Sequence, residues 1–297
     1  MKRFSLVFVI ALSLAAGIPA QARPARSEDP VITQKPAATP TPPTGRHPLQ
    51  AKSQAEFKDY NAAYGITGGA QMQAAADSFA AKYPESELRG NLYAKAMHEY
   101  QTENNPDKML AMGEKVLSLD ADNPVALVLT ASVLADKLTD TDPDRTQRIA
   151  EIKKNAGHAL ETVETGMAPL AQATPEQIAT YKNTLRSMAY SSLGILELKT
   201  GDDPGAERDM KAAADLIKAA PDPFVWYHLA LAQDHQKKYT EALASVEQAL
   251  RYMGSNSDLS ELAAGERDRL RKLTGTAILP APGPGPQGQP SPTPPPF

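Results

Sequence analysis

Proline is distributed unevenly along this chain, and its distribution limits where a folded domain can lie. Of the 26 prolines, seven lie between residues 23 and 50 and nine between residues 280 and 297, whereas only nine fall within 51–274. The two proline-rich segments contain few large apolar groups, so burial cannot offset the entropy cost of ordering them. We therefore expect one folded region, 51–274, between a Pro-rich disordered linker at 23–50 and a Pro-rich disordered tail at 275–297. The tail is an uncharged spacer or a PxxP ligand for an aromatic groove.

The region 51–274 has the periodicity of helices. Apolar residues recur at helical spacing, and the pattern breaks at proline or glycine, as at Asn105-Pro106 and Asn123-Pro124. No segment requires a strand, so the sequence predicts an all-α fold. The expected helices are 52–65, 69–82, 86–102, 106–119, 125–138, 144–164, 175–199, 204–219, 223–236, 240–253 and 258–273.

The later hairpins repeat one pattern. A large aromatic residue is followed three residues later by leucine and a small residue, and the second helix carries further small residues. One copy has Trp226, Leu229-Ala230 and Ala242, and the preceding copy has Tyr190, Leu193-Gly194 and Ala206. Tyr93 and the string Val116–Pro124 form an earlier, similar copy. These segments resemble the tetratricopeptide repeat, a helical hairpin of 34 residues.

The spacing of the copies agrees with this resemblance. Matching second-helix positions lie 34, 43, 54 and 36 residues apart, at Lys82, Val116, Ala159, Ala213 and Ala249. The resemblance implies a right-handed α-solenoid of about five hairpins, with insertions in the middle units and a C-terminal capping helix. In that last helix, Asp258 with Glu261 would form a capping box. Its apolar face would consist of Leu259, Leu262, Leu270 and Leu273.

In this family the first helices of successive hairpins line a concave groove that holds peptide partners. Only Lys95 and Lys199 could grip a terminal carboxylate, which argues against a chaperone-tail adaptor. Ordinary surface exposure or packing between repeats is the alternative role for every groove residue. Carried onto this sequence, the groove residues are Phe57, Tyr60, Asn61, Tyr64, Lys95, His98, Ser191, Ser192, Ile195, Leu198, Lys199, Phe224, Tyr227, His228, Leu231, Asp234 and His235.

The chain contains few residues suited to catalysis. It has no cysteine, and no nucleophile-elbow, phosphate-loop or zinc-protease motif occurs. We therefore predict that it is not an enzyme and has no cofactor or metal. The nearest candidate metal site is the acidic string Asp140–Asp144 with Glu151, spaced like an EF-hand loop. However, Arg145 replaces the loop glycine, and Pro143 favours Asp142 as a helix cap.

The first 22 residues resemble a secretory signal. Lys2 and Arg3 precede an apolar stretch, and Ala20-Gln21-Ala22 offers a cleavage site. We expect 1–22 to be a signal peptide, with an uncleaved anchor as the alternative, and the product to be periplasmic or secreted with no transmembrane segment after cleavage. With 31 basic and 35 acidic residues, the chain is a poor nucleic-acid binder.

These expectations combine into one functional prediction. The chain would be a protein–protein interaction module or scaffold in a bacterial cell envelope, binding a peptide or protein partner in the concave groove. The turn Tyr83–Leu88 is similar to turns in repeat proteins that assist envelope assembly. Two alternatives stay open: a structural spacer acting through its proline-rich arms, or a metal-dependent activity in the insertions between repeats.

Overall fold

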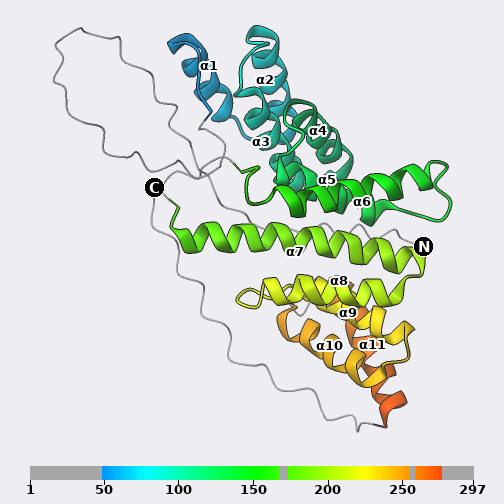
Figure 1. Ribbon diagram of the computed structural model, residues 1–297. Coiled ribbons are helices and arrows are strands. Elements are labelled where there is room, and N and C mark those ends of the chain that lie inside the picture. The colour runs from blue at the N-terminus through cyan, green and yellow to red at the C-terminus, as the bar shows by residue number, and fades with distance from the viewer. Residues whose placement is uncertain (1–48, 168–172, 254–257, 276–297) are drawn as a thin grey trace, which may run out of the picture.

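The computed structural model describes residues 49–167, 173–253 and 258–275, and their regular secondary structure is entirely α-helical (Figure 1). The expected signal peptide, most of the linker and nearly all of the tail lie outside these residues. The predicted all-α class is confirmed for the described part of the chain. Its helices are α1 (Gln54–Tyr64), α2 (Gly69–Lys82), α3 (Arg89–Thr102), α4 (Pro106–Leu119), α5 (Pro124–Lys137), α6 (Arg145–Thr162), α7 (Pro175–Thr200), α8 (Asp203–Leu216), α9 (Pro223–His235), α10 (Tyr239–Tyr252) and α11 (Asp258–Thr274).

Capping residues followed by proline fix where several helices begin. Asn105, Asn123, Thr174 and Asp222 each accept a hydrogen bond from a main-chain N–H in the first turn of the helix that follows. Proline occupies the next position in all four, where its missing N–H costs no intrahelical hydrogen bond. These local signals explain why the predicted starts of these four helices lie within one residue of the observed ones.

One predicted start and one predicted cap were wrong because side chains hold a turn ahead of the helix. Helix α3 begins at Arg89 rather than at residue 86, since the Ser86 hydroxyl accepts a hydrogen bond from the Leu88 N–H at 3.1 Å. Asp142 is not the cap of α6. It accepts hydrogen bonds from the N–H and hydroxyl of Thr139, at 2.9 and 2.8 Å, and the helix begins only after Asp144.

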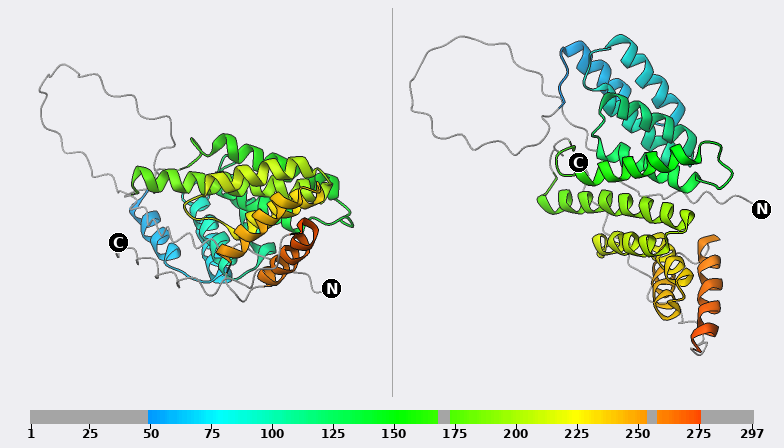
Figure 2. Two further views of the ribbon diagram at one scale, coloured as in Figure 1. Left: turned by 90° about the horizontal axis from the view of Figure 1, so that it is seen from below. Right: turned by 45° about the vertical axis from the view of Figure 1, so that its right-hand side comes forward.

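Each helix packs on the next along the chain, from α1 at one end of the molecule to α11 at the other (Figures 1 and 2). Substantial contacts beyond consecutive helices are α1 with α3, α5 with α7, and α7 with α9. These further pairs all join odd-numbered helices. In these three pairs the first helix of one hairpin lies beside the first helix of the next, whereas α3 and α5 are not such a pair.

The apolar core follows this order as three successive clusters, centred on α1–α7, α5–α9 and α9–α11. Small residues permit close helix contact where the sequence predicted it. A Cβ atom added to Gly194 of α7 would lie 2.9 Å from the fully buried Met210 side chain of α8. Ala206, Ala230 and Ala242 are likewise fully buried.

The predicted apolar face of α11 is only partly correct. Leu259 and Leu270 are buried, whereas Leu262 and Leu273 are about half exposed, at 52% and 50%. Helix α11 packs on α10 alone among its major contacts. One neighbouring helix covers a narrow stripe, and the two exposed leucines lie outside it.

Candidate functional site

A hollow in the middle of the molecule is bordered by α5, α7 and α9, with α4 and the end of α3 at its edge. Its volume is about 90 Å³. Clefts for cofactors and drug-sized ligands usually measure several hundred Å³, so this space suits a single inserted side chain. The lining residues are Gln101, Pro106, Met109, Leu129, Ser132, Val133, Asp136, Thr184, Ser187, Met188, Ser191, Ile195, Ile217, Asp222, Phe224 and Val225.

Helical spacing places these side chains in two facing stripes. Residues three, four and seven positions apart lie on one side of a helix. Helix α5 contributes such a stripe, Leu129, Ser132, Val133 and Asp136. Helix α7 contributes a second, Thr184, Ser187, Met188, Ser191 and Ile195.

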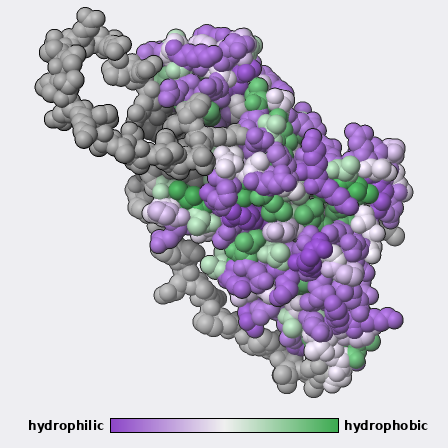
Figure 3. Space-filling view, viewed as in Figure 1, coloured by the Kyte–Doolittle hydropathy of each residue, from purple (hydrophilic) through white to green (hydrophobic). Residues whose placement is uncertain are grey.

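Two of the lining serines add little polarity. The Ser132 hydroxyl donates to the Val128 carbonyl oxygen at 2.8 Å, and its oxygen lies 2.9 Å from the Ser192 hydroxyl. The Ser187 hydroxyl donates to the Ala213 carbonyl oxygen at 3.0 Å. Because these groups are satisfied within the protein, the surrounding walls remain effectively apolar. Figure 3 shows apolar residues gathered in a band across the middle of one face, at the level of α7, between hydrophilic surfaces.

The only charged side chains among the described residues of the lining are the carboxylates of Asp136 and Asp222. Asp222 caps α9 by accepting a hydrogen bond from the Phe224 N–H at 2.8 Å. Burial raises the pKa of the Asp222 carboxyl to about 7, although main-chain N–H groups of α9 act in the opposite direction. Burial also raises the pKa of Asp136, which lies in the last turn of α5.

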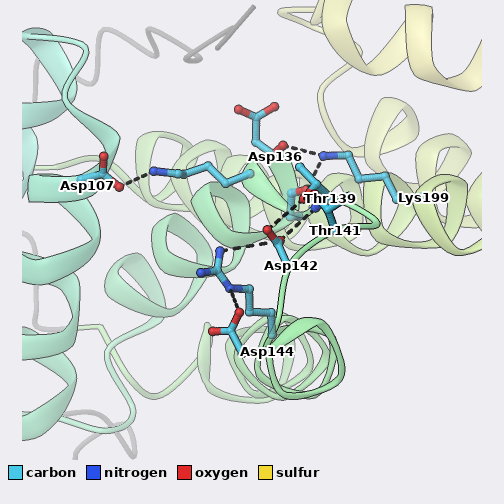
Figure 4. Close-up of polar contacts among 10 residues, drawn as sticks. Asp107, Asp136, Thr139, Thr141, Asp142, Asp144 and Lys199 are labelled. Atoms are coloured by element: carbon cyan, nitrogen blue, oxygen red, sulfur yellow. Dashed lines mark hydrogen bonds and ion pairs between the residues drawn. The ribbon is translucent and has the colours of Figure 1, made fainter. Parts of the chain in front are cut away.

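Lys199 of α7 lies beside Asp136 but does not bind its carboxylate. The Lys199 ammonium donates to the main-chain carbonyl oxygens of Ala135 and Asp136, at 2.8 and 2.5 Å (Figure 4). These carbonyls belong to the C-terminal turn of α5, where they lack an intrahelical partner. Burial lowers the pKa of Lys199. This predicted groove cation therefore stabilises the end of a helix.

Three of the predicted groove residues line the hollow, namely Ser191, Ile195 and Phe224. The His228 ring packs against the Phe224 ring with centroids 4.0 Å apart and planes tilted by 42°, and its Nδ1 lies 2.9 Å from the Phe224 carbonyl oxygen. Burial lowers the pKa of His228 to about 4, which keeps the imidazole neutral. Tyr227 contacts the His228 ring edge-on at 5.6 Å.

The remaining predicted residues on α9 lie apart from the hollow. Asp234 pairs with Arg269 of α11 at 2.5 Å, and the exposed His235 pairs with Asp203 of α8 at 2.8 Å. Leu231 is half-buried and does not line the hollow. This end of α9 is therefore held by its neighbouring helices.

The predicted residues near the N-terminal end also lie away from the hollow. Tyr60 is buried in the core, while Phe57 is half-buried and Asn61 exposed. Tyr64 packs beside the Lys95 ammonium, at 4.8 Å from its ring centroid.

On α3, Lys95 donates hydrogen bonds to the Tyr64 and Ile66 carbonyl oxygens at the end of α1. His98 lies 3.4 Å from the Gln101 side-chain oxygen. Gln101 is a residue of the hollow that the sequence reasoning did not select.

Sequence reasoning also missed the contribution of α5, which supplies Leu129, Val133 and Asp136 to the hollow. The repeat pattern is faintest in this hairpin, so no groove residues were assigned to it. A usable signal was present. Asp136 is an acidic residue in the last turn of a helix that is otherwise buried on nearly all sides.

The aspartates of the acidic string after α5 form contacts with other side chains of the protein (Figure 4). Arg148 pairs with Asp144 at 2.9 Å and lies 3.8 Å from Asp142, while Arg145 pairs with the exposed Asp140 at 3.2 Å. Within 49–167, 173–253 and 258–275, no group of three or more His, Asp or Glu side chains is arranged to hold a metal ion.

A second hollow, of about 330 Å³, lies among the turns that precede α3 and α5. Its lining is more polar and includes Glu85, Glu87, Arg89 and Asp120, together with Leu49 at the start of the described chain. It has no continuous apolar wall from facing helices, which makes it a weaker candidate for anchoring a partner.

Among the described helices, none combines the length and the apolar character needed to span a bilayer. A scan against protein-family models found no match, and a search of curated proteins found no similar sequence.

Proposed function

We propose that this protein is an exported, non-enzymatic helical-repeat module of tetratricopeptide type that binds a peptide segment of a protein partner in the cell envelope. The single observation that carries the proposal is the apolar hollow lined by α5, α7 and α9, which are the first helices of three successive hairpins. An extended or helical peptide could lie across these helices and insert one side chain between them.

Recurring backbone geometry supports a repeated unit. Asn104, Gly201 and Lys237 adopt left-handed conformations, with φ of 54°, 80° and 62°. Each lies two residues before the second helix of its hairpin, α4, α8 or α10. The hairpin of α5 and α6 departs from this pattern, because residues 138–144 lengthen its turn.

Recurring contacts between hairpins support the same conclusion. Each joins the end of a first helix to the start of the preceding second helix. Glu103 accepts from the Gly69 N–H at 2.6 Å, Lys137 pairs with Asp107, and His235 pairs with Asp203 at 2.8 Å. Equivalent contacts at similar spacing are expected when hairpins stack in one register.

The test is to fill the hollow. Ser191 is nearly buried, at 8% exposure, and lies at the hollow on α7. Ser191→Leu should occupy the space that an inserted side chain needs. Thr180→Leu places the same side chain on an exposed position of the same helix and serves as the control.

Both variants would be used beside residues 23–297 for affinity capture from envelope extract, after thermal melts show that each remains cooperatively folded. We expect a partner retained by the unmodified chain and by Thr180→Leu, and lost by Ser191→Leu. Equal retention by both variants would instead place binding on the arms or on another face, as the spacer alternative requires.

A further inference from the structure

Asp136 is the unusual residue of the hollow, because the charges of Lys199 and Lys137 attract its carboxylate but neither lysine binds it. No hydrogen bond or ion pair joins its carboxylate to another described residue. The two nearby lysines bind other groups. Lys199 donates hydrogen bonds to main-chain carbonyl oxygens, and Lys137 pairs with Asp107. Figure 4 shows the Asp136 carboxylate directed away from the Lys199 ammonium.

This arrangement costs stability. The C-terminal end of a helix carries partial negative charge, which disfavours an acidic side chain in the last turn. Burial disfavours the carboxylate further and raises its pKa. The nearby charges of Lys199 and Lys137 offset part of this cost, but no hydrogen bond within the described structure requires an aspartate here.

The titratable side chains around the hollow are acidic. Asp222 supplies a second carboxyl group from α9, and no lysine, arginine or histidine is among the described lining residues. Apolar walls with an unpaired Asp136 carboxylate at the edge are complementary to an apolar group that has a cation beside it. They would repel an acidic ligand.

Resting on the function proposed above, we infer that the hollow binds a peptide segment in which an aliphatic or aromatic side chain is followed or preceded closely by lysine or arginine. The apolar side chain fills the space between α5 and α7, and the ammonium or guanidinium group pairs with the Asp136 carboxylate.

The test uses a random dodecapeptide library displayed on phage and selected on the full mature chain. We expect the selected sequences to be enriched in apolar residues adjacent to lysine or arginine and depleted in aspartate and glutamate. One selected peptide, labelled with fluorescein, would then be titrated by fluorescence anisotropy. Asp136→Asn should weaken its affinity about tenfold. Asp140→Asn is the matched control, because Asp140 is exposed in the adjoining turn and does not line the hollow.

A second readout does not depend on any protein variant. Replacing the basic residue of the selected peptide with glutamine should weaken binding to the unmodified chain about tenfold, and should have little effect on binding to Asp136→Asn. Apolar sequences selected without preference for charge, or an acidic preference, would overturn this inference and leave the proposed groove intact. Selected peptides that bind Ser191→Leu as tightly as the unmodified chain would overturn the proposed function as well.

Discussion

Lys95 and Lys199 make the same contact in two different parts of the chain. Lys95 of α3 donates hydrogen bonds to the Tyr64 and Ile66 carbonyl oxygens at the end of α1, and Lys199 of α7 donates to the carbonyl oxygens at the end of α5. In both cases the lysine lies on the first helix of the following hairpin. Carbonyls at helix ends lack intrahelical partners, so each ammonium caps the first helix of the preceding hairpin.

We predict that Lys199→Met lowers the free energy of unfolding by about 1–2 kcal/mol, because it leaves the α5 carbonyls without their charged donor while keeping the apolar stem. Urea denaturation would measure the change. Lys211→Met is the control, since Lys211 is exposed on α8 and makes only a 4.0 Å contact with Asp215. An equal effect from the two substitutions would contradict the capping role.

Left-handed backbone conformations at two turns predict substitutions with opposite effects on stability. Lys237 has a φ of 62°, a conformation that costs roughly 1 kcal/mol for a residue with a Cβ atom. Lys237→Gly should therefore stabilise the protein by about 0.5 kcal/mol after the entropy cost of glycine. Gly201→Ala, at φ 80° with open space around it, should destabilise it by about 1 kcal/mol. Thermal melts of both variants would check the two signs together.

Close packing between α7 and α8 can be tested with two glycines. Gly194→Ala should destabilise the protein by about 1–2 kcal/mol, because the new methyl group meets the buried Met210 side chain. Gly157→Ala on α6 should stabilise it by about 1 kcal/mol, since nothing lies within 4 Å of the added Cβ and alanine favours the helix. Chemical denaturation would measure the change in unfolding free energy of each variant. Stabilisation by Gly194→Ala would show that α7 and α8 can move apart freely.

His228 makes stability depend on pH. Its pKa is about 4 in the folded protein and about 6.5 in an unfolded chain, so the unfolded state binds the proton first as the pH falls. The contribution of His228 is fully present above pH 6.5 and is lost as the pH falls to 4. The linked loss is about 3 kcal/mol.

The measurement is the difference in unfolding free energy between the unmodified chain and His228→Gln, at several pH values. Glutamine keeps a hydrogen-bond donor for the Phe224 carbonyl oxygen but does not titrate. The difference should shift in favour of His228→Gln as the solution is acidified from pH 7 to pH 4. A constant difference would mean that the folded protein accepts the protonated imidazole.

Local sequence determined most of the helices. Thr174-Pro175 and Asp222-Pro223 mark the starts of α7 and α9 because capping and the fixed φ of proline act within a few residues. The burial of Gly194 and Ala230 was likewise predictable from the repeated pattern. The cap of α6 was not, since the Asp142 side chain can either cap the helix or close the turn by accepting hydrogen bonds from Thr139, and it does the latter.

Tertiary structure decided the location of the candidate site. Sequence reasoning placed groove residues near both ends of the region, and only Ser191, Ile195 and Phe224 of them line the central hollow. Whether Lys199 faces a partner or the end of α5 depends on how two helices more than 60 residues apart in sequence are positioned. The position of Asp136 at the hollow likewise depends on how the helices are placed relative to one another. A hollow is the space left between α5, α7 and α9, so it follows from their relative placement, which no short segment of the sequence encodes.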